Sequence, residues 1–173
     1  MSVTFLDLVS LCKNDYQTVL DIFYETSGKK NFSSNEEKSN FEFKYFRYYL
    51  EKEPRLCFCV KLDERIIGYI IGSSDTLRDK ELFNHSPYLE LFKEFYVDFP
   101  AHLHLNLTSS TRGKGVGVLL INEFISRILP IAGVHIITGS RERNIHFYQK
   151  CGFNYMEYSN DETKSLIFMG KKL

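Results

Sequence analysis

The alternation of hydrophobic and polar positions predicts helices and strands that follow one another along the whole chain. Apolar residues recur at every second position in some segments, the period of a strand, and at every third or fourth position in others, the period of a helix. In the first half, Asn14 or Asp15 is expected to cap a helix, Pro54 to stop another, and Asp63-Glu64 to form a hairpin turn. The elements predicted there are a strand at 3–8, helices at about 14–27 and 36–52, and strands at 55–62 and 65–73.

The second half of the chain starts with an insert at about 75–99, which is too long for an ordinary hairpin loop. Helical character is predicted within it around Arg78–Phe83 and Tyr88–Tyr96. The helix at 115–128 has an apolar residue at every fourth position and is expected to be buried. The other elements predicted are strands at 101–107, 134–139, 153–158 and 164–171, the last two paired with each other, and a helix at 142–151.

Length and charge favour one domain, residues 1–173, with a small partner. A chain of 173 residues with 43% hydrophobic content can bury one substantial core. Lys+Arg and Asp+Glu balance at 22 each, so the overall charge favours neither a nucleic acid nor a membrane surface as the partner. The N-terminus lacks a basic region followed by an apolar stretch, and the apolar run at 66–71 is too short to cross a bilayer. We expect a cytoplasmic protein, either a monomer or a homodimer.

The segment 108–117 reads Thr-Ser-Ser-Thr-Arg-Gly-Lys-Gly-Val-Gly, which is typical of a phosphate-binding loop. Unpaired backbone N–H groups at a helix N-terminus hold a pyrophosphate, and glycine lets the phosphates reach the backbone. The spacing excludes a Walker loop, because Gly115 stands where the magnesium-binding hydroxyl is required. It also excludes a dinucleotide fingerprint, because Val118 replaces the third glycine and no acidic residue follows at the required distance.

What remains in the loop is Arg112-x-x-Gly115-x-Gly117, which resembles the Gln/Arg-x-x-Gly-x-Gly/Ala signature of the GNAT superfamily of acyl-CoA-dependent N-acetyltransferases. Further on, Phe147–Phe153 reads Phe-Tyr-Gln-Lys-Cys-Gly-Phe and is similar to that family's Phe-Tyr-x-x-x-Gly-Phe signature. With the strand before the loop, the resemblance covers roughly residues 98–156. It implies an α/β (α+β) fold with a mixed, splayed central β-sheet flanked by helices on both faces.

The resemblance also implies that acetyl-CoA is the co-substrate and that its pantetheine arm runs along the strand at 101–107. The cofactor-binding residues that it implies are Leu105, Asn106, Leu107, Arg112, Gly113, Lys114, Gly115, Val116, Gly117 and Asn144. The N–H of Leu105 or of a neighbour is expected to bind the developing oxyanion. The family often has Asn-x-x-Ala before the Phe-Tyr pair, whereas these offsets hold Arg141 and Asn144 here, so the usual amide contact to pantetheine is missing or shifted.

Two histidines and a tyrosine are the expected catalytic residues. Period-two geometry puts His102 and His104 on one face of their strand, and an imidazole with a pKa near ~6.5 suits a base at neutral pH. The arylalkylamine branch of the family has a similar His-x-His pair, and His104 is preferred to His102 as the base. Tyr148 is implied as the acid for the departing thiolate, because a phenol with a pKa near ~10 is protonated at neutral pH.

Two other interpretations of the histidine pair stay open. Both residues could be buried, hydrogen-bonded core histidines. They could also be half of a zinc site, but no acidic or cysteine ligand stands at a recognisable spacing, and no metal is expected. The four cysteines lack Cys-x-x-Cys spacing and are expected to be reduced, small apolar residues, so direct attack by the acceptor is preferred to a covalent enzyme.

The expected acceptor is a primary amine of a small molecule or a peptide. Tyr45 belongs to an aromatic cluster in the helix at 36–52, which in the family roofs the acceptor site. Asp98, with Glu90 and Glu94 as the other acidic candidates of the insert, is expected to attract a cationic amine if the insert walls the acceptor cleft. A structural cap or a dimer contact is the alternative role of the insert. The alternative function is a catalytically silent module that binds acyl-CoA or a protein partner, which the missing Asn-x-x-Ala supports.

Overall fold

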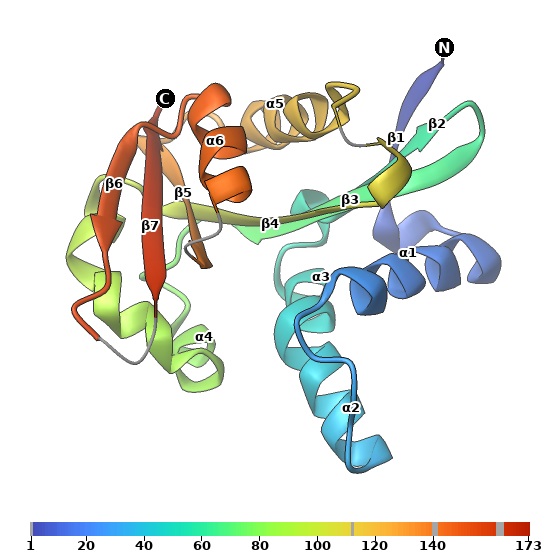
Figure 1. Cartoon of the computed structure of the whole chain (residues 1–173), viewed down its shortest axis with the longest axis horizontal. Helices are drawn as coiled ribbons and strands as arrows, with labels where there is room; N and C mark the ends of the chain where they lie inside the picture. Colours follow the sequence, from blue (N-terminus) through green and yellow to red (C-terminus); the bar gives the residue numbers. More distant parts are fainter. Residues whose placement is uncertain (1, 112, 140–141, 162–164) are drawn as a thin grey trace. The chain divides into compact units, whose positions relative to one another are not determined.

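The computed structural model describes residues 2–111, 113–139, 142–161 and 165–173, and its contacts divide the chain into two compact units (Figure 1). Unit 1 comprises Met1–Gly72 and His104–Arg127, and unit 2 comprises Ser73–Leu103 and Ile128–Leu173. Strand β4 (Ala101–Leu107) passes from unit 2 into unit 1 after Leu103. The glycine-rich loop therefore belongs to unit 1 and the second signature to unit 2.

The strands of unit 1 are β1 (Val3–Asp7), β2 (Phe58–Leu62) and β3 (Arg65–Ser73), joined as antiparallel neighbours, with the unit 1 part of β4 beside β3. Asp63 and Glu64 have φ of 46° and 65°, the conformation that a tight hairpin turn requires, so the predicted turn is confirmed. The strand predicted at 55–62 starts later, because the chain first makes a short 3₁₀ turn after Pro54.

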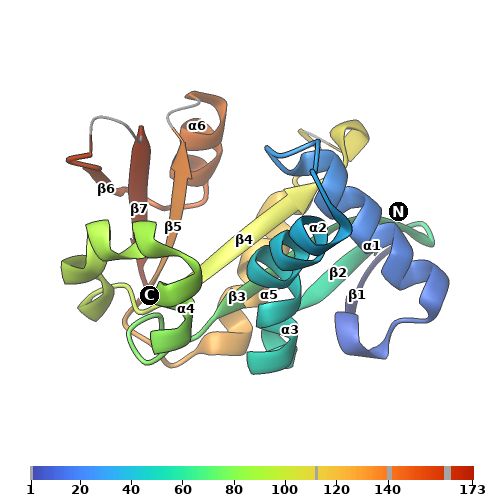
Figure 2. The ribbon, with the colours of Figure 1, turned by 90° about the horizontal axis from the view of Figure 1, so that it is seen from below.

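Helices cover both faces of the unit 1 strands. α1 (Lys13–Thr26), α2 (Asn35–Glu42) and α3 (Tyr48–Lys52) lie on one face, the one nearest the viewer in Figure 2. α5 (Val116–Ile128) lies on the other face, as Figure 1 shows. The prediction of the α1 cap is wrong by two or three positions: Cys12 precedes the helix, so both polar candidates for the cap stand inside its first turn.

A π-helical segment, Phe43–Arg47, interrupts the single helix predicted at 36–52. Phe46 in this segment has no exposed surface, and its ring centroid lies 5.4 Å from those of both Phe23 and Tyr69. A π turn is wider than an α turn, so the residues that follow it, Tyr49 among them, point in other directions than a continuous α-helix would give them.

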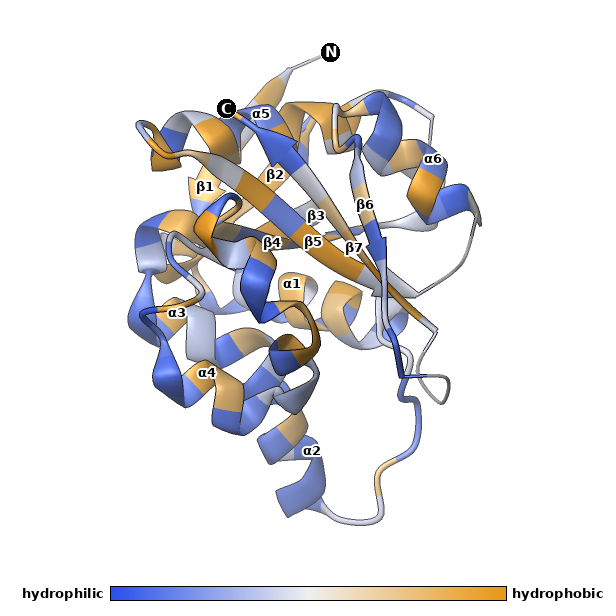
Figure 3. Cartoon of the chain, turned by 90° about the vertical axis from the view of Figure 1, so that its left-hand side faces the viewer, coloured by the Kyte–Doolittle hydropathy of each residue, from blue (hydrophilic) through white to orange (hydrophobic). Residues whose placement is uncertain are grey.

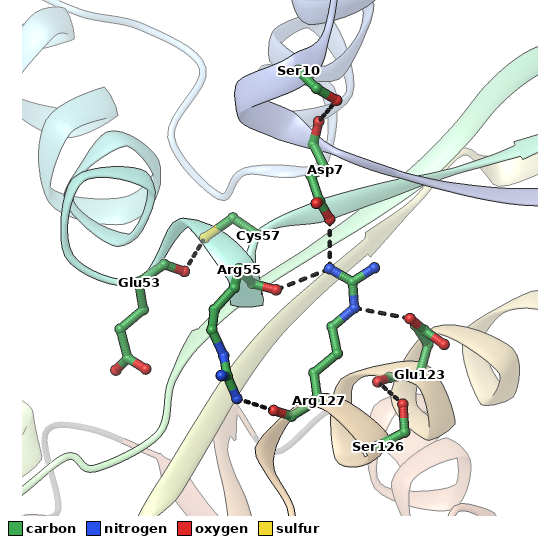
Figure 4. Close-up of polar contacts among 8 residues, drawn as sticks. All are labelled: Asp7, Ser10, Glu53, Arg55, Cys57, Glu123, Ser126 and Arg127. Atoms are coloured by element: carbon green, nitrogen blue, oxygen red, sulfur yellow. Dashed lines mark hydrogen bonds and ion pairs between the residues drawn. The ribbon is translucent and has the colours of Figure 1, made fainter.

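The C-terminal end of α5 is tied to the strands of unit 1 by Arg127 (Figure 4). One guanidinium nitrogen of Arg127 donates to the Asp7 carboxylate at 2.6 Å and to the Arg55 carbonyl at 2.9 Å, and Nε donates to Glu123 at 2.8 Å. The guanidinium also lies 4.0 Å from the centroid of the Phe58 ring. These contacts fix the helix whose other end carries the glycine-rich loop.

Unit 2 contains the beginning of β4, then β5 (Gly133–Gly139), β7 (Leu166–Lys172) and β6 (Tyr155–Tyr158), in that order across the sheet. β4 and β5 are parallel, whereas β5–β7 and β7–β6 are antiparallel, so the predicted pairing of the last two strands is confirmed. Strands flanked by helices in both units confirm the predicted mixed α/β class. No helix among the described residues is long and apolar enough to span a membrane.

The insert packs its aromatic residues on the strands of unit 2. It forms α4 (Lys80–His85) and a run of 3₁₀ helix at Pro87–Val97, which is interrupted at Phe92, where φ of −125° and ψ of 16° are not helical. Phe92, Phe95, Tyr96 and Phe99 all place their rings within 6.1 Å of the Phe168 ring of β7. In Figure 3 the apolar residues of β5 and β7 are orange, whereas much of α4 is blue.

Candidate active site

The glycine-rich loop is anchored to the sheet of unit 1 just before its glycines. The Thr108 N–H donates to the Ile67 carbonyl of β3 at 2.9 Å. Thr111 is buried, and its hydroxyl donates to the Thr108 carbonyl at 2.9 Å. Arg112 lies outside the described residues, so its contact with a phosphate stays a prediction.

Beyond this anchor, the loop has the geometry of an anion site. Gly113 and Gly115 both have φ of 77°, which favours glycine, and a Cβ added to either would lie in open space. α5 starts directly afterwards, and the Val118 N–H donates to the Gly115 carbonyl at 3.1 Å. A helix start leaves its first amides without partners inside the helix and carries the positive end of its dipole. With the exposed Lys114 beside it, the loop fits a phosphate group.

The part of β4 expected to bind the pantetheine arm lies very close to β3. A Cβ added to Gly68 of β3 would lie 2.3 Å from Leu107 Cδ2 and 2.7 Å from the Asn106 carbonyl oxygen, so only glycine fits there. The Asn106 side chain donates from Nδ2 to the hydroxyl of the buried Tyr69 at 2.8 Å. A cofactor contact from Asn106 would therefore use its backbone.

His104 has a hydroxyl partner on α3, and both residues belong to unit 1. Its Nε2 lies 2.9 Å from the Tyr49 hydroxyl, and the two rings meet edge to face with centroids 5.2 Å apart. Burial lowers the pKa of His104 to about 4. The imidazole is thus neutral at physiological pH, and it holds a proton less tightly than the ordinary histidine assumed from the sequence.

His102, in the unit 2 part of β4, is buried and has partners of its own. Only 4% of its surface is exposed, and its Nδ1 lies 2.7 Å from the Thr76 hydroxyl. Its ring lies 5.5 Å from that of His135, its register partner on β5. These contacts favour the core interpretation for His102 more than for His104.

The second signature forms the end of α6 (Glu142–Lys150) in unit 2. Gly152 has φ of 91° and donates its N–H to the Gln149 carbonyl at 2.9 Å, while the Phe153 N–H donates to the Tyr148 carbonyl at 3.0 Å. This is a Schellman cap, and the contact of the Phe153 and Tyr148 rings at 5.5 Å completes it, which explains the Tyr, Gly and Phe spacing. Burial raises the pKa of Tyr148 above its ordinary value, so its phenol is protonated at neutral pH.

Residues 17–153, which include both the loop and the end of α6, match the model of the acetyltransferase (GNAT) family. The chain belongs to this family. The protein is therefore an acyl-CoA-dependent acetyltransferase with acetyl-CoA as its acyl donor, as the two signatures implied.

Several solved structures share the fold of this acetyltransferase. SsHAT has a TM-score of 0.74 at 18% identity over 99% of this chain and 98% of its own. The PaiA N-acetyltransferase of Thermoplasma acidophilum, in complex with coenzyme A, has a TM-score of 0.64 at 19% identity over 100% of both chains. The NatC complex bound to Gag peptide and CoA has a TM-score of 0.65 at 14% identity over 100% of this chain and 99% of that chain. At these identities the likeness shows the fold alone. No curated protein matches the sequence.

The residues of the acetyltransferase that are expected to bind the acceptor make contacts within their own units. The Tyr45 ring, in the π segment of unit 1, lies 4.9 Å from the Phe41 ring, and Lys44 Nζ lies 4.8 Å from its centroid. Asp98, in unit 2, is largely exposed and forms an ion pair with Lys172. An amine bound by Asp98 would have to share its carboxylate with Lys172.

Each unit of the acetyltransferase thus brings together part of the predicted site. Unit 1 holds the loop, Leu105–Leu107 and His104, and unit 2 holds His102, Tyr148 and Asn144. Asn144 Nδ2 lies 3.5 Å from the Thr138 hydroxyl, a weak contact that leaves the amide close to the end of β5. In the described part of the chain, no three His, Cys, Asp or Glu side chains are grouped so that they could hold a metal ion.

Two further candidates, Tyr49 and Thr76, escaped the sequence analysis. Tyr49 lies 55 positions from His104 and Thr76 lies 26 positions from His102, so no local spacing signals either pair. Tyr49 stood out only as one aromatic residue among several on its helix, and Thr76 lies in the insert, outside both signatures.

Proposed function

We propose that this acetyltransferase transfers the acetyl group of acetyl-CoA directly to a primary amine of a small molecule or a peptide. The observation that carries the proposal is the start of α5, where Gly113 and Gly115 leave open space beside a helix N-terminus. PaiA was solved with coenzyme A, which supports the acyl donor, and NatC was solved with CoA and a peptide, which supports a peptide as one class of acceptor. A cytoplasmic monomer or homodimer is part of the same proposal.

The loop and β4 together would hold the acyl donor. The loop amides would bind the pyrophosphate, with Arg112 and Lys114 adding positive charge. The edge of β4 at Leu105–Leu107 would pair with the pantetheine amides as an added strand does, and Asn144 offers a side-chain amide from α6. Bound acetyl-CoA supplies an activated thioester. The Leu105 N–H would then stabilise the negative charge that develops on the acetyl oxygen.

Two protons have to move during the transfer. His104, ahead of His102, accepts the proton of the attacking amine. Burial lowers the pKa of His104 to about 4, so the imidazole is unprotonated at neutral pH and can accept a proton, as a weaker base than an ordinary histidine. Tyr148 stays protonated because burial raises its pKa, and it donates its O–H to the departing thiolate.

The buried thiols argue against an acetyl-cysteine route. Burial raises the pKa of Cys57 to about 12 and that of Cys59 to about 11, and it also raises the pKa of Cys151. A thiol is a much weaker nucleophile than a thiolate. Direct attack by the amine on the thioester needs no such group.

Tyr45 in unit 1 and Asp98 in unit 2 are proposed, each separately, as contacts for the acceptor. An aromatic face attracts a cation, and Lys44 already uses the Tyr45 ring in this way. A carboxylate such as Asp98 attracts a protonated amine before it loses its proton. These two side chains come from different units, and each is offered as a separate contact with the acceptor.

Ligand-induced stabilisation tests the cofactor loop. Acetyl-CoA should raise the Tm of the wild-type protein, since a ligand at about 100 times its Kd stabilises the folded state by about 2.7 kcal/mol. Gly115→Asp should abolish the shift, because it adds bulk and negative charge where the pyrophosphate binds. Gly28→Asp is the matched control, since Gly28 also has open space around its Cβ position but lies far from the loop in sequence. An undiminished shift in a folded Gly115→Asp protein would remove the loop from the site.

One assay distinguishes the proposed enzyme from the alternative, a silent module that binds acyl-CoA or a protein. If the protein is an enzyme, thiol release from acetyl-CoA should accelerate with at least one member of a panel of primary amines and peptides. A silent module would show the acetyl-CoA shift in Tm but no amine-dependent release.

A further inference from the structure

A buried set of hydrogen bonds joins the beginning of the insert to β4 within unit 2. Thr76 has no exposed surface, and its hydroxyl oxygen lies 2.8 Å from the Pro100 carbonyl oxygen and 2.7 Å from His102 Nδ1. The Thr76 N–H donates to the same Pro100 carbonyl at 2.8 Å. The hydroxyl therefore lies between a backbone carbonyl and an imidazole nitrogen. The backbone hydrogen bond from Thr76 to Pro100 also holds the residue in position.

These distances settle which atom carries each proton. A carbonyl oxygen can only accept, so the single hydroxyl proton of Thr76 points at Pro100. If that proton pointed at His102 instead, two oxygen atoms without a proton between them would face each other at 2.8 Å. The Thr76 oxygen must then accept its second hydrogen bond, and the donor is the Nδ1–H of His102. In neutral His102, Nε2 is consequently the nitrogen that carries the lone pair.

The neighbouring His135 provides an internal comparison. Its Nδ1 lies 2.6 Å from the Phe99 carbonyl oxygen, which again requires Nδ1 to be the donor. The His135 ring is stacked between those of Tyr96 and Phe168, with centroids 4.7 and 4.8 Å away. A carbonyl and two aromatic rings thus fix the orientation of His135, and none of them depends on Thr76.

We infer that Thr76 is a positioning residue, which holds His102 with its proton on Nδ1 and its lone pair on Nε2, so that Nε2 is the atom through which His102, the second candidate base after His104, takes part in proton transfer. That the accepted proton comes from the amine rests on the proposed function, whereas the tautomer does not. This gives the insert a role beyond covering the strands of unit 2. Thr76, near the start of the insert, determines which ring nitrogen of His102 in β4 carries the proton.

The tautomer of His102 can be measured directly by imidazole ¹H–¹⁵N correlation NMR at pH 7.5, with the His102 and His135 signals assigned from His102→Gln and His135→Gln proteins. The wild-type spectrum should show His102 with a protonated Nδ1 and an unprotonated Nε2. Thr76→Ser keeps the hydroxyl and should preserve this pattern. Thr76→Val keeps the shape but removes the hydroxyl, so its His102 signals should change, while those of His135 stay in place in both variants.

Kinetics then test whether the tautomer matters. Thr76→Val should lower kcat about tenfold with KM for acetyl-CoA unchanged, since the loss of a hydrogen bond worth about 1.4 kcal/mol corresponds to a tenfold change. Thr76→Ser keeps the hydroxyl and should retain most of the wild-type rate. A wild-type His102 protonated on Nε2 would overturn the inference, and this result does not depend on the folding of either Thr76 variant. An altered tautomer in Thr76→Val with an undiminished kcat would overturn the role in transfer. If no amine is acetylated at all, the proposed function fails while the NMR result still decides the role of Thr76 in fixing the ring.

Discussion

The phenol oxygen of Tyr49 lies 2.9 Å from Nε2 of His104 and joins α3 to β4 inside unit 1. Tyr49 is 4% exposed, so the pair is shielded from water on the side of the helix. The π segment just before α3 sets the direction in which Tyr49 points. Tyr49 therefore orients the imidazole that we propose as the base.

Replacing Tyr49 with Phe should slow the reaction without weakening the binding of acetyl-CoA. The ring and its edge contact stay, and only the hydrogen bond to His104 is lost. A net hydrogen bond of about 1 kcal/mol corresponds to a fall in kcat of roughly five- to tenfold. Tyr48→Phe is the matched control, because it removes one phenol oxygen from a buried tyrosine on the same helix. Equal kcat values in the wild type and Tyr49→Phe would show that the pair is structural.

The pKa of His104 predicts how its contribution to stability changes with pH. The folded value of about 4 lies below the unfolded value near 6.5, so between these values the unfolded chain binds a proton that the folded chain does not. The wild type should therefore lose stability as the pH falls through this window, by up to about 1.4 kcal/mol per pH unit from this residue. Urea unfolding of the wild type and of His104→Gln between about pH 4.5 and 7 measures the difference. Curves that stay parallel across this range would contradict a neutral His104 with a lowered pKa.

Gly68 is predicted to be irreplaceable because β3 and β4 touch there. A Cβ at this position would lie 2.3 Å from Leu107 Cδ2 and 2.7 Å from the Asn106 carbonyl oxygen, and the backbone atom cannot move away without shifting β4. Gly68→Ala should cost about 1–3 kcal/mol of unfolding free energy or more, and it should weaken the binding of acetyl-CoA along β4. Gly28→Ala, which adds a methyl group in open space, should leave both quantities nearly unchanged. Wild-type stability and affinity in Gly68→Ala would show that the strands separate freely.

The contacts of Arg127 predict a stability effect far from the glycine loop. Arg127→Met removes hydrogen bonds to Asp7, Glu123 and the Arg55 carbonyl and should destabilise the fold by about 1–3 kcal/mol. Arg78→Met removes an equally charged side chain that is 89% exposed and should change stability by no more than about 0.5 kcal/mol. Chemical denaturation of the two variants makes the comparison, and equal effects would mean that the contacts in Figure 4 contribute nothing specific.

Features set by neighbouring residues could be predicted from the sequence, whereas features set by distant contacts could not. The turn at Asp63-Glu64 and the pairing of β6 with β7 depend on local residue types, and both are confirmed. The π segment depends on the burial of Phe46 between Phe23 and Tyr69, which a helix period cannot reveal. The helical character predicted in the insert is confirmed by α4 and by the 3₁₀ run Pro87–Val97, whereas the type of helix could not be predicted from the sequence.

In the candidate site too, features set by neighbouring residues could be predicted, whereas features set by distant contacts could not. The tight backbone turn at Gly115 and the helix end after Tyr148 leave fixed spacings in the sequence, so these two positions could be selected as candidates, and their roles stay predictions. The lowered pKa of His104 could not be predicted, because it arises from burial in the folded unit. The hydroxyl partners of the two β4 histidines could not be predicted either, because Tyr49 comes from α3 and Thr76 from the insert.

The most direct test of the proposed transfer is the stoichiometry of thiol release and N-acetylated product, measured with acetyl-CoA and a panel of primary amines and peptides. We predict one acetylated amine for each thiol released. We also predict a kcat for Tyr148→Phe that is about 10²–10⁴-fold lower at an unchanged Kd for CoA, because the general acid is lost while the ring and its contact with Phe153 remain. A protein that binds CoA but forms no acetylated amine, or a Tyr148→Phe protein with wild-type kcat, would contradict it.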